Sequence, residues 1–137
     1  ADPQRWGRAD IQNVARSIDS LRSRRDIDEL RLAVSGTGAG GAFSWLVAET
    51  LGPAIRGVVL HEAALPRQSK IRTAEPGRFR WILFAPSRTD GALPSRIVSD
   101  CEQLKKAGYD VGVLPEGVEA SIPAEILCGF VEALGVL

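Results

Sequence analysis

The order of apolar and polar residues along the chain predicts helices that alternate with short buried strands. From 10 to about 24, apolar residues recur at spacings of three and four, which indicates a first amphipathic helix. Short apolar runs bounded by polar residues or glycine indicate strands, because a strand covered on both faces of a sheet is apolar throughout. The expected strands are 30–35, 57–60, 79–85 and 110–114. The further expected helices are 40–51, 94–107 and 123–134.

Glycine and proline residues mark the ends of these elements. Gly52-Pro53 ends the second helix, and Pro123 stands in the first turn of the last one. Strands that alternate with helices imply a mainly parallel sheet with helices on both faces. The pattern therefore predicts a single α/β domain, a three-layer sandwich that spans residues 1–137.

Composition narrows the range of partners. The chain has 137 residues with a formal net charge of zero, so its charge favours neither nucleic acid nor an anionic membrane surface. No apolar run approaches the roughly 20 residues that a membrane-spanning helix needs. We therefore expect neither nucleic acid nor a membrane as a partner.

Few residues are suited to binding a metal ion. The chain has one histidine, His61, and two cysteines, Cys101 and Cys128, which are far apart and lack CxxC spacing. Buried, inert thiols are the ordinary interpretation of such cysteines. We expect no metal site and no bound cofactor.

A glycine-dense turn between the first strand and the second helix is the most informative motif. Its residues are Gly36, Thr37, Gly38, Ala39, Gly40 and Gly41. In outline the turn matches the G-x-S-x-G nucleophile elbow of hydrolases and the G-x-G-x-x-G fingerprint of dinucleotide-binding domains. Gly38 occupies the position where a hydrolase needs serine, and glycine has no side chain that could attack a carbonyl.

Four groups of residues, in this order, resemble the C-terminal part of the α/β-hydrolase fold. The resemblance is to phospholipase/carboxylesterases and polyhydroxybutyrate-depolymerase-like esterases, and it covers the chain from about Trp6 onward. The four groups are Trp6, Asp10, Val14 and Ile18; the segment 27–41; Ile82-Leu83-Phe84 with Thr89-Asp90-Gly91 and Leu93-Pro94; and the segment 117–123.

The resemblance implies that the catalytic triad is degenerate. Gly38 stands at the nucleophile position, Asp90 at the acid position, and Ala120 at the histidine position, or Glu119 if that loop is shifted by one. A serine hydrolase needs a nucleophile, a base and an orienting acid, and two of these are absent. The resemblance thus favours a non-catalytic binding or interaction module, a pseudoenzyme. An active esterase completed by groups outside this chain ranks lowest.

The resemblance also implies missing structure. The family places several strands and an oxyanion loop before the nucleophile strand, so the chain is expected to be a fragment of a longer protein. Of the N–H groups that form the oxyanion hole in the family, this chain contains only the backbone N–H of Ala39. The strand 30–35, central in the family, becomes a sheet edge, and an open apolar edge promotes aggregation. We expect the Leu30–Ser35 edge to pair with a second copy or with another part of a longer protein.

A dinucleotide-binding Rossmann-like domain is the main alternative. It would use Gly36, Gly38 and Gly41 around a pyrophosphate at the helix N-terminus, and Glu62 on a ribose. A helix precedes the glycine turn, whereas this fingerprint usually follows the first strand of its domain. Replacing serine by glycine in an elbow also produces the same glycine spacing.

Several polar residues near the expected ends of strands could face a ligand. These are His61, Glu62 and Asp90, although for His61 a hydrogen-bonded structural role, and for Asp90 a turn-capping role, is the more ordinary interpretation. Ser35 and Ser44 are the nearest hydroxyls that could replace a nucleophile. We expect Ser35 to be buried in its strand and Ser44 to point away from the turn.

Overall fold

A computed structural model describes residues 6–67, 69–76, 79, 81–86, 92–115 and 122–134. It has an α/β fold with four parallel strands in the order β1-β2-β3-β4. The strands are β1 (Ala33–Thr37), β2 (Gly57–His61), β3 (Trp81–Ala85) and β4 (Asp110–Val113). The α-helices are α1 (Arg8–Arg24), α2 (Ala39–Leu51), α3 (Ser95–Lys106) and α4 (Ala124–Leu134), with short 3₁₀ turns at Glu29–Arg31 and Gly52–Ala54.

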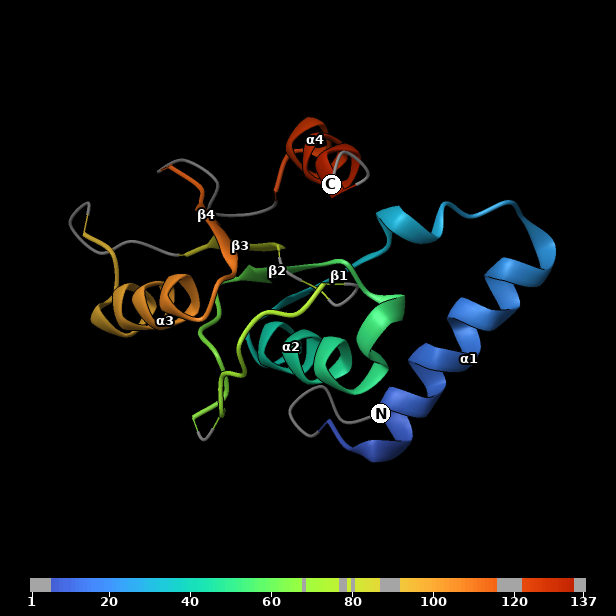
Figure 1. The fold of residues 1–137 in the computed structure, drawn as a ribbon, viewed down its shortest axis with the longest axis horizontal. Coiled ribbons are helices and arrows are strands. Elements are labelled where there is room, and N and C mark those ends of the chain that lie inside the picture. Colours follow the sequence, from blue (N-terminus) through green and yellow to red (C-terminus); the bar gives the residue numbers. More distant parts are fainter. Residues whose placement is uncertain are drawn as a thin grey trace.

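The chain builds the three layers that the pattern predicts. Strand order follows chain order, and parallel strands are joined by right-handed crossovers, so the connecting helices collect on one face. Helices α2 and α3 lie on that face, and α4, which follows the last strand, covers the other (Figure 1). Helix α1 packs against α2 at the β1 end of the sheet.

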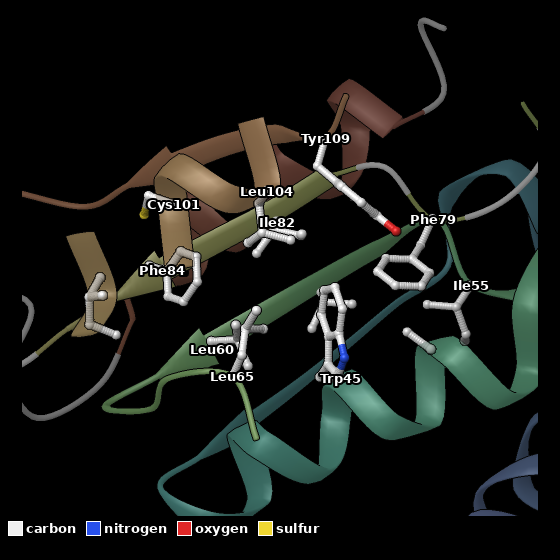
Figure 2. Close-up of a cluster of buried hydrophobic side chains, with 13 residues drawn as sticks. Trp45, Ile55, Leu60, Leu65, Phe79, Ile82, Phe84, Cys101, Leu104 and Tyr109 are labelled. Atoms are coloured by element: carbon white, nitrogen blue, oxygen red, sulfur yellow. The ribbon is translucent and has the colours of Figure 1, made fainter. Parts of the chain in front are cut away.

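The main core lies between the sheet and the α2–α3 layer. Every residue of β2 is buried, as a central parallel strand requires. Three aromatic rings meet in this core: Trp45 of α2 contacts Phe79 edge to face at 5.1 Å, and Tyr109 lies 6.0 Å from Trp45 and 5.6 Å from Phe79 (Figure 2).

The first strand begins later than the apolar pattern predicts. Glu29–Arg31 forms a 3₁₀ turn, in which the Arg31 N–H donates to the Asp28 carbonyl at 3.0 Å. The prediction of a strand at 30–35 was therefore wrong at both ends, since β1 spans Ala33–Thr37 and includes Gly36 and Thr37. The glycine-dense turn is correspondingly shorter.

Strand β1 is one of the two edge strands of the described sheet, and β4 is the other. Strand β1 pairs with β2 in parallel, from Ala33 opposite Gly57 to Thr37 opposite His61. On its other side, no strand lies beside it within the described residues. Ser35 is exposed for this reason, which corrects the expectation that a serine within the strand would be buried.

A clamp on α3 fixes the loop that follows β2. The Leu65 N–H donates to Asp100 Oδ2 at 3.0 Å, and Arg96 Nη2 donates to the Leu65 carbonyl at 2.6 Å. Asp100 is buried, and this burial raises the pKa of its carboxyl above the ordinary 3.8, against the smaller effects of the Leu65 hydrogen bond and the Arg96 charge. The folded protein therefore holds the Asp100 proton more tightly than the unfolded chain does.

This clamp should leave a signature in the pH dependence of stability. With its pKa raised on folding, Asp100 contributes most below pH 3.8, and that contribution is lost as the pH rises through the raised pKa. Asp100→Asn keeps an oxygen that can accept from Leu65 but does not titrate. We expect the unfolding free energy of the wild type, minus that of Asp100→Asn, to fall between about pH 3 and about pH 7 in urea titrations. A difference that stays flat or rises would contradict this account of Asp100.

Candidate functional site

A single residue, Gly38, makes the turn from β1 into α2. Its backbone angles are φ 56° and ψ −123°, a combination outside the left-handed helical region and strained for any residue with a side chain. Its N–H donates to the His61 carbonyl at 2.9 Å, and its carbonyl accepts from the N–H of Gly41 at 3.0 Å. Gly38 thus ties the end of β1 to both β2 and the start of α2.

The glycines on either side of the turn have different surroundings. A Cβ on Gly36 would collide with the backbone of Gly40, and one on Gly41 would collide with Ala63. Above Gly38 and Gly40, by contrast, no heavy atom lies within 4 Å of an added Cβ. The turn is therefore tightly packed at Gly36 and Gly41 and has open space beside Gly38 and Gly40.

The N-terminus of α2 starts at this opening. Ala39 and Gly40 are its first two residues, and the first N–H groups of a helix have no partner within the helix. The partial positive charge of the helix end suits a negatively charged oxygen. Ser44, one turn further on, is buried and donates from its hydroxyl to the Gly40 carbonyl at 2.9 Å, so its hydroxyl is already bonded within α2.

His61 and Thr37 meet at the ends of the two adjacent strands. His61 Nδ1 and Thr37 Oγ1 are 3.2 Å apart, and the histidine is only 7% exposed. His61 Nε2 is buried and has no hydrogen-bond partner among the residues that the structure describes. Both residues belong to motifs visible in the sequence, but no local pattern pairs them. The parallel register that places Thr37 opposite His61 is the signal that brings them together.

Glu62 lies immediately beyond His61 and faces outward. It is exposed, has a positive φ of 50°, and its N–H donates to the Ala85 carbonyl at 2.8 Å. Glu62 lines a cavity of about 250 Å³ at the carboxyl ends of β2 and β3, together with Ala63, Ala64, Pro86, Pro94, Arg96 and Ile97. In open α/β sheets, ligands bind at this end of the strands.

The remaining predicted triad positions are not placed. Asp90, Glu119 and Ala120 lie outside the described residues. The structure therefore brings Gly38, His61 and Glu62 together at one end of the sheet but does not place the acid and histidine positions relative to them.

An apolar groove follows β1 along its open edge. It has a volume of about 480 Å³ and runs between α1, β1 and α2. Its walls include Trp6, Val14, Phe43 and Val47, and its floor is formed by 34–37, with no charged residue among the described lining. This groove has no signature in the sequence, because its walls come from elements whose relative placement only the fold determines.

The described residues contain neither a metal centre nor a membrane-spanning helix. Nowhere in the described part of the chain do three His, Cys, Asp or Glu side chains gather as metal ligands would. Among the helices described, none has the length and apolar character needed to cross a bilayer.

Comparison with known proteins gives no assignment. No protein-family model matches the chain, and a search of curated proteins finds no significant match.

The Thr37–His61 contact should contribute to stability in a way that two substitutions can separate. Thr37→Val keeps the shape but removes the hydroxyl that pairs with Nδ1 of buried His61, so we expect a loss of about 1–2 kcal/mol in unfolding free energy. Thr37→Ser retains the hydroxyl and should lose less. Urea unfolding of the two variants measures the difference, and equal stabilities would show that the hydrogen bond contributes nothing.

Proposed function

We propose that this chain is a non-catalytic domain with the layout of the C-terminal part of an α/β-hydrolase, and that it binds a partner instead of turning over a substrate. The conformation of Gly38 carries the proposal. The resembled enzymes hold their nucleophile on a sharp, strained turn between a strand and a helix. Gly38 makes such a turn, with φ 56° and ψ −123°, and glycine has no side chain that could react.

The topology around the turn supports this layout. After the turn come α2, two further parallel strands, α3 and β4, and then a last helix on the opposite face of the sheet (Figure 1). The small residues at Gly36 and Gly41 fit the close packing under the turn. Fold likeness alone does not imply an activity, and it is the lack of a reactive side chain at Gly38 that speaks against catalysis.

Within the described residues, Thr37 and His61 come nearest to a nucleophile and its base. Their side chains lie at hydrogen-bonding distance, 3.2 Å. A working base also needs a third group that orients it, and within the described residues, which leave out Asp90, His61 Nε2 has no hydrogen-bond partner. Thr37 is moreover the last residue of β1, one position before the turn on which the resembled enzymes present their nucleophile.

Dinucleotide binding is a second candidate, favoured by the surroundings of the three glycines. Gly36 makes a tight approach, Gly38 leaves open space above the turn, and Gly41 packs closely on the strand, which are the roles of the glycines in that fingerprint. Glu62 follows the adjacent strand, where the ribose-binding acid would stand. Against it, ligands of such sheets bind where the strand order reverses, and the described order β1-β2-β3-β4 has no reversal at β1.

A fluorophosphonate probe tests the absence of catalysis. We expect no covalent labelling of the wild-type chain by mass spectrometry, with an active serine hydrolase as positive control. Gly38→Ser restores a hydroxyl at the turn, and we expect that it stays unlabelled for want of an oriented base and loses about 1–3 kcal/mol of stability through its positive φ. Labelling of the wild type at Ser35, Thr37 or Ser44 would overturn the proposal, and Thr37→Val would identify a Thr37–His61 pair as its source.

Thermal unfolding with NAD or NADP separates the second candidate from the first. A ligand that binds only the folded state raises Tm by mass action. We expect no change in Tm at about 1 mM of either dinucleotide, a concentration about a hundredfold above the Kd of a typical tight site. A rise of several degrees that Glu62→Ala abolishes would instead establish the dinucleotide-binding function.

A further inference from the structure

We propose that a polar cavity between α3 and the loop segments 65–67 and 69–71 binds a phosphate group, carried by free phosphate or by a small phosphate monoester. The cavity has a volume of about 310 Å³. Five of its eight lining residues have polar or charged side chains, namely Arg67, Ser69, Arg96, Asp100 and Gln103. Its chemistry differs from that of the apolar groove beside β1, and the inference does not rest on the proposed function.

Two arginines bring positive charge to the cavity from different elements. Arg67 comes from the loop after β2, and Arg96 comes from the first turn of α3. Among the described residues, neither arginine forms an ion pair with a carboxylate, and Arg67 forms no hydrogen bond either. Arg96 donates from Nη2 to the Leu65 carbonyl. A guanidinium carries several N–H groups, so both side chains retain donors that suit phosphate oxygens.

Ser69 adds a buried hydroxyl to the lining. Its backbone N–H donates to the Pro66 carbonyl at 3.1 Å, which closes a turn and fixes the position of the residue. Its Oγ is buried and has no hydrogen-bond partner among the described residues. A buried hydroxyl without a partner costs free energy, and such groups in native structures are normally paired with protein, water or a ligand. Because Ser69 lines the cavity, a ligand oxygen seated there can accept its O–H.

Donors from three separate positions suit a phosphate better than a carboxylate. A carboxylate has its two oxygens in one plane, and a single guanidinium can pair with both of them. A phosphate monoester has three terminal oxygens and a charge of about −1.5 to −2 at neutral pH. Arg67, Arg96 and Ser69 can each donate to a different oxygen of such a group. The lining therefore favours a tetrahedral anion with two negative charges.

The other two polar residues favour an ester over free phosphate. Asp100 is the single acidic residue in the described lining, and its Oδ2 accepts from the Leu65 N–H at 3.0 Å. Gln103 donates from Nε2 to Ser99 Oγ at 3.3 Å, which leaves its amide oxygen as an acceptor. Both side chains suit the hydroxyl groups of an organic body attached to the phosphate. The cavity volume, at the lower end for small-molecule sites, leaves room for a short body of this kind.

Isothermal titration calorimetry of the whole chain measures the binding. The probes are glycerol 3-phosphate and inorganic phosphate, at about pH 8 and constant ionic strength, so that both are largely dianionic. We expect saturable binding of glycerol 3-phosphate with a Kd below about 1 mM, weaker binding of inorganic phosphate, and none of glycerol. Malonate, a dianion with carboxylates only, should bind at least about tenfold more weakly than glycerol 3-phosphate. Equal binding of the two phosphate probes would identify free phosphate as the ligand of the same site.

Two substitutions separate binding from folding. Arg67→Gln removes an exposed charge that makes no contact with the described residues, so it should weaken binding at least about tenfold and leave Tm unchanged. Its matched control is Arg16→Gln, which removes an equally exposed charge on α1, across the molecule from α3, and should bind as the wild type does (Figure 1). Ser69→Ala should also weaken binding by about tenfold, whereas Tm of the ligand-free protein stays the same or rises, because the hydroxyl has no partner to lose.

Several outcomes would overturn the inference. The first is the absence of saturable heat with either phosphate probe up to about 10 mM. The second is equal binding by the Arg67→Gln and Arg16→Gln variants, which would show that the cavity is not where the anion binds. Malonate that binds as tightly as glycerol 3-phosphate would exclude a site selective for phosphate. Unchanged binding by Ser69→Ala would remove the buried hydroxyl from the site and with it the argument for a tetrahedral anion.

Discussion

The one-residue connection at Gly38 is the constraint on which the arrangement of this site depends. A chain that leaves a strand and enters a helix within a single residue must take a positive φ, and only glycine does so without strain. Because the turn is so short, α2 begins directly against β1, and the close approaches at Gly36 and Gly41 follow from that. The same turn donates to the His61 carbonyl and thereby joins the ends of β1 and β2.

The strands of the sheet are buried to different extents, and this determines which polar groups can form hydrogen bonds with water. Strand β2 is buried throughout, and among the described residues the side chain of His61 at its end pairs with Thr37. Asp100 is also buried, and the hydrogen bond from the Leu65 N–H offsets part of the cost of burying its carboxyl group. Strand β1 is exposed at Ser35 and Thr37, and its environment is closer to that of a surface.

Much of the fold could be predicted from the sequence because its signals are local. Apolar runs located all four strands, and glycine and proline marked the helix ends, since both act within a few residues. The bounds of β1 could not be predicted, because Glu29–Arg31 forms a 3₁₀ turn and because Gly36 lies in the strand although glycine is uncommon in strands. The exposure of Ser35 was missed for a different reason, namely that no local pattern says which strand will be an edge. The Thr37–His61 pair and the groove depend on register and on helix placement, which arise only when distant segments pack.

The order of the strands has a consequence for how the chain acquires its structure. Each strand pairs with the one that immediately precedes it along the chain, so no strand has to wait for a distant segment to be made. A polypeptide emerging from the ribosome could therefore lay down the sheet progressively from β1 to β4, with α4 closing the second face last. Contacts between neighbouring units also shorten the loops that must close at each step, which favours rapid assembly. Within the described sheet, β1 and β4 are the two strands that keep one side open throughout that growth.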